Sequence, residues 1–169
     1  VGHLRSAVVG ESIKRMLKFM GQTVISDVHL GDYGLQIGQV IYGLQEKNIA
    51  PHEITLSMLE EIYPQMSQLC KENEEVKTKC ALITKELQDG NETYQEYFKV
   101  IRKLSGDDIK RIYDYLDVSF DYWYGESDSY PYIEMLTKDL EAKNLLEESE
   151  GAKIIEVKKE TDTKELPPL

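Results

Sequence analysis

The segment Val1-Gly2-His3-Leu4-Arg5-Ser6 decides the fold, together with the later segment His29-Leu30-Gly31-Asp32-Tyr33-Gly34-Leu35-Gln36-Ile37-Gly38. In each segment we expect a β-strand to pass into an α-helix, with glycine at the junction. The start of a helix offers unpaired backbone N–H groups and a partial positive charge, and glycine lets a nucleotide lie directly on the main chain. The two segments therefore predict ligand-binding turns.

The residues around these turns predict a helix, a strand and a second helix. Apolar residues at three- and four-residue spacings predict a helix from Leu4 to Met20, ended by Gly21. The β-branched run Thr23–Val28 predicts a strand, and a helix follows from about Leu35 to Lys47. The predicted inner faces are Val9, Ile13, Met16, Leu17 and Met20 in the first helix, and Ile37, Val40, Ile41 and Leu44 in the second. This is half of a parallel α/β unit, whose leading strand would precede Val1.

A long helical region follows a change of composition near Pro51. We expect nearly all of residues 54–116 to be helical, with a break at Gly90 and a new helix opening at Gly106-Asp107. The predicted apolar stripes are Leu56, Leu59, Ile62, Met66 and Leu69, then Val76, Cys80, Ile83 and Leu87, then Tyr97, Val100, Ile101 and Leu104, and last Ile109, Ile112, Tyr113 and Leu116. This region is predicted to be an insertion in the α/β unit.

The last part of the chain returns to mixed structure. Alternation over Val118–Tyr124 predicts a strand that rejoins the sheet and ends at Gly125-Glu126-Ser127. A helix is predicted over Tyr132–Asn144, with Ile133, Leu136 and Leu140 inward. We expect a hairpin from Leu145–Glu147 and Ala152–Val157, turning at residues 148–151, and then an exposed tail over 158–169.

Aromatic residues cluster in this part of the chain, as Phe120, Tyr122, Trp123, Tyr124, Tyr130 and Tyr132. On alternating strand positions they are predicted to be core. Trp123 falls on the opposite face of the predicted strand and is the member to test for stacking on a single-stranded RNA end.

The predicted fold class is α/β: part of a Rossmann-like parallel sheet, incomplete, with a mainly α-helical insertion. We divide the chain into residues 1–53, the first half of a nucleotide-binding core; 54–117, the helical insertion; and 118–169, the return to the core with strand, helix and hairpin.

Composition narrows the class of protein further. The 169 residues contain no apolar run of the roughly 18 residues that span a bilayer. The start at Val1, with a motif already under way and no signal peptide, indicates a piece of a larger cytoplasmic protein. Cys70 and Cys80 have no histidine nearby and are predicted to be reduced thiols, not zinc ligands. The net charge of −11 argues against strong nucleic-acid binding.

A longer string of residues carries a family resemblance. It comprises Gly2-His3-Leu4-Arg5-Ser6, Gly10-Glu11-Ser12-Ile13 with Arg15, and His29-Leu30-Gly31-Asp32-Tyr33-Gly34 with Gln36 and Gly38. This string resembles the catalytic core of arginyl-tRNA synthetases. Gly2 and His3 match the last two residues of the class I signature His-x-Gly-His, whose first His would precede Val1. Tyr33, Leu35 and Ile37 stand where the family usually has Trp, Thr and Phe, so any hydrogen bond from that Thr is absent.

The resemblance implies a function and site residues. It implies a class I ligase that activates arginine with ATP and transfers it to tRNA(Arg), with ATP as a substrate alongside Mg²⁺, no tightly bound cofactor and no resident metal. His3 would be catalytic and bind ATP phosphate, with Gly2 beside the nucleotide. Glu126 would bind the arginine guanidinium, since it matches a Gly-Glu-Ser of the family, and carboxylates meet that fork with paired bonds. Asp32 and Gln36 are further candidates on the substrate side. Asp32 could instead orient His29 or close the turn through its own backbone, of which turn formation is the stronger explanation, and Gln36 could simply begin the helix.

Other parts of the family pattern fall outside these residues. They are an asparagine and a lysine ahead of the first motif, a Tyr and an Asp that complete the arginine pocket, the second signature loop and the anticodon-binding domain. We therefore expect this polypeptide alone to be inactive and to bind tRNA weakly. The alternatives are a non-enzymatic helical interaction module, or another nucleotidyltransferase of the same superfold.

Overall fold

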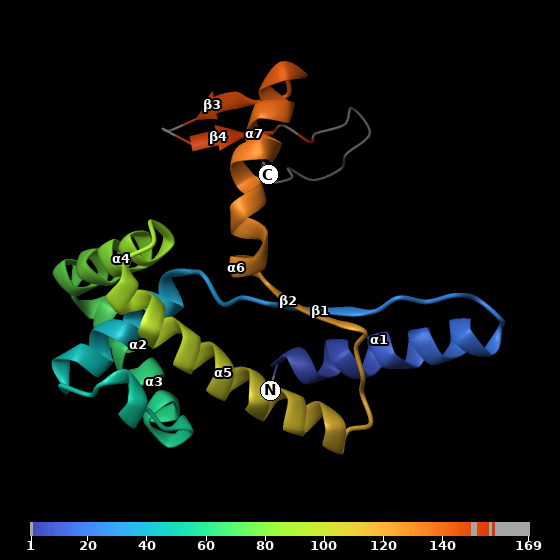
Figure 1. The fold of residues 1–169 in the computed structure, drawn as a ribbon, viewed down its shortest axis with the longest axis horizontal. Coiled ribbons are helices and arrows are strands. Elements are labelled where there is room, and N and C mark those ends of the chain that lie inside the picture. The colour runs from blue at the N-terminus through green and yellow to red at the C-terminus, as the bar shows by residue number, and fades with distance from the viewer. Residues whose placement is uncertain (1, 150–151, 156, 158–169) are drawn as a thin grey trace. The chain divides into compact units, whose positions relative to one another are not determined.

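The structure is a computed structural model that describes residues 2–149, 152–155 and 157, with the backbone alone at 2, 3 and 152 (Figure 1). The chain forms two compact units, Val1–Ser127 and Asp128–Leu169. The division at residues 53 and 117 stays a prediction.

The predicted helix, strand and helix open the first unit. Helix α1 covers Gly2–Phe19, and Gly21 follows it with a φ of +82°. Strand β1 covers Asp27–Leu30, and helix α2 covers Leu35–Glu46. The predicted inner face of α2 is confirmed, because Ile37, Val40, Ile41 and Leu44 are all buried.

The sheet of this unit has two parallel strands in the part of the chain that the structure describes. Strand β2 covers Tyr122–Gly125 and pairs in register with β1, from Asp27 opposite Tyr122 to Leu30 opposite Gly125. Both predicted strands began too early. At the start of the paired strands, the Ser26 carbonyl accepts the Asp121 N–H at 2.9 Å and the Tyr122 N–H at 3.1 Å. The Asp121 carboxylate accepts hydrogen bonds from the Ser26 N–H at 2.8 Å and the Ser26 hydroxyl at 2.9 Å, and the regular ladder begins after these bonds, at residues 27 and 122.

The predicted helical region is confirmed as a bundle. A short 3₁₀ turn over Pro51–Glu53 leads into α3 (Leu56–Glu72), α4 (Glu74–Gln88) and α5 (Glu92–Tyr115). The side chains of Thr55, Asn73 and Asn91 accept backbone N–H bonds at the starts of these helices. Helices α3, α4 and α5 enclose one hydrophobic core together with α2. The buried residues of this core are Tyr33, Ile37, Val40, Ile41, Leu44, Ile54, Leu59, Ile62, Ile83, Leu87, Tyr97, Phe98 and Ile101.

Helix α5 corrects one prediction. No new helix opens at Gly106-Asp107, because α5 runs without a break from Glu92 to Tyr115. A glycine inside a helix costs only about 1 kcal/mol relative to alanine. Inward-facing side chains on both sides of Gly106 offset that cost, with Ile101 in the bundle core and Tyr113 in a second cluster beside α1 and the strands.

Close packing between α2 and α4 depends on Gly38. A Cβ at this position would collide with the backbone carbonyl oxygen of Cys80 and with the hydroxyl of Thr84. The glycine singled out in the sequence as part of a ligand-binding turn therefore serves helix packing in this structure.

Replacing Gly38 by alanine is expected to lower the free energy of unfolding by about 1–3 kcal/mol, the usual cost of overpacking. Urea unfolding of the chain measures this. The matched control is Gly106→Ala, because a Cβ there meets nothing within 4 Å, and it should raise stability by about 0.5–1 kcal/mol. Equal shifts for the two variants would show that the α2–α4 contact is not tight.

The buried face of helix α1 is not the face that was predicted to be core. Val9, Ile13 and Met16 are 53%, 47% and 58% exposed, so that prediction was wrong for the described chain. The buried face instead carries Ala7 with two charged residues, Glu11 and Lys14. Positions 7, 11 and 14 follow the helical period as well as positions 9, 13 and 16 do, so spacing could not choose between them.

A network of charges holds this buried face. Glu11 Oε2 lies 2.6 Å from Lys14 Nζ, and Glu11 Oε1 lies 2.7 Å from Arg15 Nε. The segment before β2 joins it, because the Ser119 N–H donates to Glu11 at 3.1 Å and Lys14 donates to the Ser119 hydroxyl at 3.0 Å. Burial works to raise the pKa of Glu11, but the bonds from Lys14, Arg15 and Ser119 outweigh it and lower that pKa from 4.5 to about 2.

The aromatic residues of β2 also differ from prediction. Tyr122 and Tyr124 are each 48% exposed, and their rings stack on one another at 5.5 Å. Trp123 faces the interior instead, with ring centroids 6.0 Å from Tyr113 and 5.9 Å from Phe120. The alternation fails because residues 118–121 are not part of the strand, so the faces cannot be counted from Val118.

The second unit contains the predicted helix and a hairpin whose first strand lies two residues later than predicted, because Glu148 and Ser149 of the predicted turn belong to that strand. After α6 (Glu126–Ser129), which crosses the boundary, come a 3₁₀ turn at Tyr130–Tyr132 and α7 (Ile133–Ala142). Strands β3 (Glu147–Ser149) and β4 (Ala152–Ile154) pair antiparallel. Of the inner face predicted for α7, Ile133 and Leu136 are 50% and 54% exposed, so the prediction was wrong for these two residues, while Leu140 is half-buried. Residues 150–151 of the predicted turn and the predicted tail over 158–169 lie outside the described residues.

Both cysteines are free thiols, as predicted. Cys70 and Cys80 are buried between α3 and α4 with their Sγ atoms 3.6 Å apart. Burial and the neighbouring sulfur raise the pKa of the Cys80 thiol to about 12. Among the residues described, no helix is long and apolar enough to cross a membrane.

Candidate functional site

A pocket of about 660 Å³ lies between α1, β1 and α5 in the first unit. Leu4 and Ser6 line it from the first turns of α1, and His29 and Gly31 line it from the end of β1. Tyr113 closes it on the α5 side. The pocket thus joins residues of the two predicted ligand-binding turns.

The first predicted segment supplies a helix start at this pocket. Gly2 and His3 are the first two residues of α1, directly before Leu4. The side chain of His3 lies outside the described part of the chain. The unpaired N–H groups of a first helical turn can bind an anion such as phosphate.

The second predicted segment meets Glu126 at the carboxyl end of the sheet. Glu126 follows β2 directly and is exposed at the start of α6. Its Oε1 lies 3.9 Å from the point that a Cβ on Gly31 would occupy. The carboxylate therefore stands over Gly31, the residue directly after β1, where parallel sheets bind their ligands.

Asp32 ties together the ends of the two strands. Its carboxylate is 11% exposed and accepts bonds from the Ser127 N–H at 3.0 Å and the Ser127 hydroxyl at 2.7 Å. Its Oδ2 also lies 3.0 Å from Arg102 Nε of α5. The Asp32 N–H closes a local turn onto the Leu30 carbonyl at 2.9 Å, but the side chain reaches across the sheet.

Of the two other residues singled out near the second segment, Gln36 lies on the surface and Tyr33 lies in the core. Gln36 is exposed in the first turn of α2, and its Oε1 lies close to Gly34. Tyr33 is buried in the bundle core with its ring 5.3 Å from Phe98. The described residues contain no group of three or more His, Cys, Asp or Glu that could hold a metal ion.

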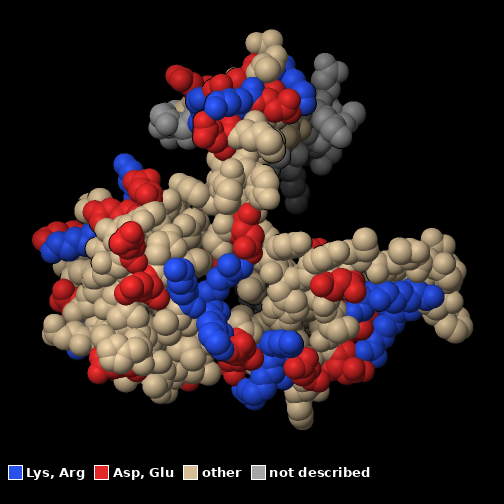
Figure 2. Space-filling model, viewed as in Figure 1, with Lys and Arg blue, Asp and Glu red and all other residues tan. Residues whose placement is uncertain are grey.

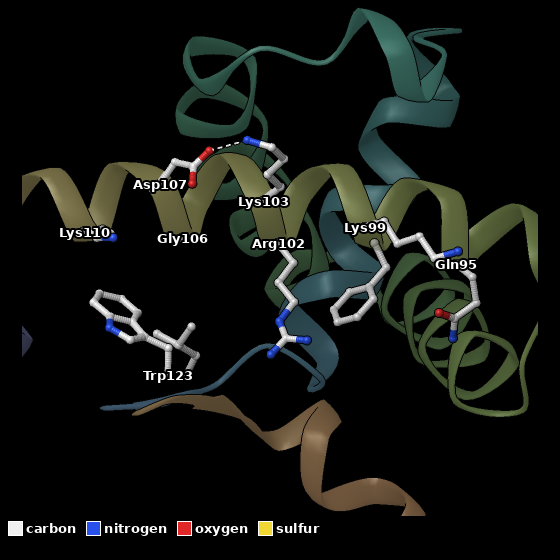
Figure 3. A pocket seen from close by; sticks show the side chains of 10 residues that line it. Gln95, Lys99, Arg102, Lys103, Gly106, Asp107, Lys110 and Trp123 are labelled. Carbon is white, nitrogen blue, oxygen red and sulfur yellow. Dashed lines mark hydrogen bonds and ion pairs between the residues drawn. The ribbon is translucent and has the colours of Figure 1, made fainter. Parts of the chain in front are cut away.

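A second pocket, of about 570 Å³, runs along α5. Four cations line it, over a floor that includes Leu30 and Trp123; they are Lys99, Arg102, Lys103 and Lys110. Figure 2 shows Lys and Arg gathered over α5 in the first unit, although the chain as a whole is acidic. In Figure 3, Arg102 extends toward the strands, while Lys103 turns away and pairs with Asp107 at 2.5 Å.

Arg102 and the bond from Ser127 to Asp32 were not predicted from the sequence. Arg102 stands on a helix with many other charges, 70 residues after Asp32 (102 − 32). Nothing in its local pattern sets it apart from Lys99 or Lys103. Ser127 lies in the Gly-Glu-Ser segment that was noted, but its bond to Asp32 depends on how the two strands pair.

Comparisons with known proteins agree on one family. The family described as "tRNA synthetases class I (R), catalytic domain" matches residues 1–167. An arginine–tRNA ligase of Agathobacter rectalis is 46% identical over 99% of this chain, and one of Alkaliphilus oremlandii is 40% identical over all of it. The crystal structure of arginyl-tRNA synthetase from Plasmodium falciparum superimposes with a TM-score of 0.76 at 25% identity, over 99% of this chain.

The match covers a limited share of these proteins. The chain spans 30% and 31% of the length of the two bacterial relatives and 28% of the Plasmodium falciparum chain.

Proposed function

This chain belongs to the class I arginyl-tRNA synthetase family, and from that premise we propose that it forms part of the active site of a cytoplasmic arginine–tRNA ligase. The substrates are arginine, ATP accompanied by Mg²⁺, and tRNA(Arg). One observation carries the proposal: Leu4, next to His3, and Gly31, beneath Glu126, line the same pocket. Family membership favours this function over a helical interaction module or another nucleotidyltransferase.

Each proposed residue has a task in the first chemical step. The arginine carboxylate attacks the α-phosphorus of ATP and pyrophosphate leaves, so negative charge on the phosphoryl group needs stabilisation and the reactants need alignment. The start of α1 with Gly2 and His3 supplies N–H donors and an imidazole for phosphate. Glu126 supplies a carboxylate for the guanidinium, and Gln36 is a further polar group at the same edge.

The first step leaves an arginyl adenylate, and in the second step a hydroxyl at the 3′ end of tRNA takes the arginyl group from it as an ester while AMP leaves. With a net charge of −11, the chain by itself is proposed to bind tRNA weakly.

Activity requires residues beyond this chain, because the relatives are about three times as long. The purified 169-residue chain is therefore expected to show no arginine-dependent exchange of pyrophosphate into ATP. A chimera in which this chain replaces the matching part of the Agathobacter rectalis ligase should show that exchange and should aminoacylate tRNA(Arg). A folded chimera that binds tRNA but activates no arginine would contradict the proposed function.

A further inference from the structure

Both carboxylate oxygens of Asp32 already have donors within the chain. Its Oδ1 accepts the Ser127 N–H, while its Oδ2 accepts the Ser127 hydroxyl and pairs with Arg102. The carboxylate is also almost wholly enclosed, at 11% exposed. A guanidinium arriving from solvent would meet a carboxylate that is nearly enclosed and is already bonded through both oxygens.

These bonds attach Asp32 to the residue that follows Glu126. Backbone and side chain of Ser127 are both held, so the peptide leaving Glu126 has a fixed direction. Glu126 itself is exposed and lies over Gly31, one residue before Asp32. We call Asp32 with its bonds to Ser127 and Arg102 the anchor. The position of the Glu126 carboxylate therefore depends on this anchor.

Gly125 makes room for this anchor. It is the last residue of β2, it is buried, and a Cβ there would overlap the carboxylate of Asp32. In the Gly-Glu-Ser segment, Gly125 leaves space for the Asp32 carboxylate, Glu126 is the exposed acid, and Ser127 binds Asp32.

Arg102 connects the anchor to the helical bundle. It reaches from α5 to the strand ends (Figure 3) and is 31% exposed, with its Nε 3.0 Å from Asp32. Its charge compensates that of Asp32, so the anchor adds little negative charge beside Glu126. A guanidinium also keeps a fixed orientation that a lysine ammonium does not.

We propose that Asp32 and Arg102 are positioning residues for arginine recognition: their ion pair, bonded to Ser127, holds the Glu126 carboxylate in place for the substrate guanidinium. This rests on the proposed function. Asp32 acts through Glu126 and does not touch arginine, so removing Asp32 should matter only while Glu126 is present.

The test is a double-mutant cycle in the full-length chimera. Asp32→Asn should raise the KM for arginine at least tenfold and change the KM for ATP less than twofold. In a Glu126→Gln background, the same change should raise the arginine KM less than twofold further. Arg102→Met should behave like Asp32→Asn, and Arg102→Lys should recover only part of the loss. Asp107→Asn, which removes an exposed acid paired with Lys103, is the matched control and should leave both KM values unchanged.

Amide hydrogen exchange of the peptide containing Ser127 gives a readout independent of arginine. Asp32→Asn should speed exchange there at least tenfold, with the α2–α4 helices unaffected. Unchanged exchange, or an equal rise in KM with and without Glu126, would overturn the positioning role and leave the proposed function standing. Faster exchange in Asp32→Asn, with Glu126→Gln having no effect on arginine KM, would instead refute arginine binding by Glu126, and the positioning role with it.

Discussion

Replacing Glu126 by glutamine is expected to raise the arginine KM of the full-length chimera on the order of a hundredfold. Truncating one partner of a hydrogen-bonded charge pair costs about 2–5 kcal/mol, and each 1.4 kcal/mol is about tenfold in affinity. Glutamine keeps the length of the side chain but offers one acceptor oxygen and no charge. The KM for ATP should stay within about twofold, because Glu126 is proposed to meet only the guanidinium.

Steady-state pyrophosphate exchange at varied arginine concentrations measures this change in the arginine KM. Glu61→Gln is the control, since Glu61 is an exposed acid of α3 whose ion-pair partner is Lys47. Discrimination against citrulline, the neutral isostere of arginine, should also fall in Glu126→Gln. An arginine KM equal to that of the parent would remove Glu126 from the binding site.

Replacing Glu11 by alanine is expected to lower the free energy of unfolding by about 3 kcal/mol or more. Lys14 is only 8% exposed in its side chain and would lose its carboxylate partner, and an uncompensated buried charge costs about 3–5 kcal/mol. Urea unfolding at neutral pH measures the loss. Glu75→Ala is the control, because the Glu75–Lys79 pair is on the surface and its loss should leave the midpoint unchanged.

A double replacement separates charge from packing. Glu11→Leu with Lys14→Met removes both charges together, and such replacements are often neutral or stabilising. It should recover most of the stability lost in Glu11→Ala. If the double variant is as unstable as the single one, the network acts through its bonds to Ser119 and not through the buried charge.

The same carboxylate gives stability a pH dependence. The pKa of Glu11 is lowered from 4.5 to about 2 on folding, so its contribution is complete above about pH 4.5 and is lost as the pH falls toward 2. The gap in unfolding free energy between the parent chain and Glu11→Gln should therefore be widest at neutral pH and should close near pH 2. A gap that is constant over this range would show that Glu11 has no shifted pKa.

The helices were predictable where one stripe of apolar residues stands alone. Ile37, Val40, Ile41 and Leu44 form a single such stripe on α2, and all four are buried. Helix α1 offered two faces with the same period, and only tertiary bonds from Ser119 show that Glu11 and Lys14 are the ones enclosed. Buried charges are rare, so the apolar face of α1 was predicted to be buried, but a charge that is paired can be enclosed.

The parts of the site that could be predicted are those marked by a local pattern, such as a residue that directly follows a strand. Gly31 and Glu126 each follow a strand, and parallel strands bring such positions together. The bond from Asp32 to Ser127 depends on the register of β1 against β2, which no local pattern encodes. Arg102 lies on a helix far along the chain, and its pairing with Asp32 depends on where α5 crosses the strands.

The unbroken course of α5 has a mechanical consequence. Its 24 residues extend for about 36 Å and act as a stiff rod. Phe98, near one end, is fixed in the bundle, and Tyr113, near the other, packs beside α1. Arg102 lies between Phe98 and Tyr113 on this one helix. A tilt of the helical bundle would therefore move the Arg102 guanidinium together with both ends of α5.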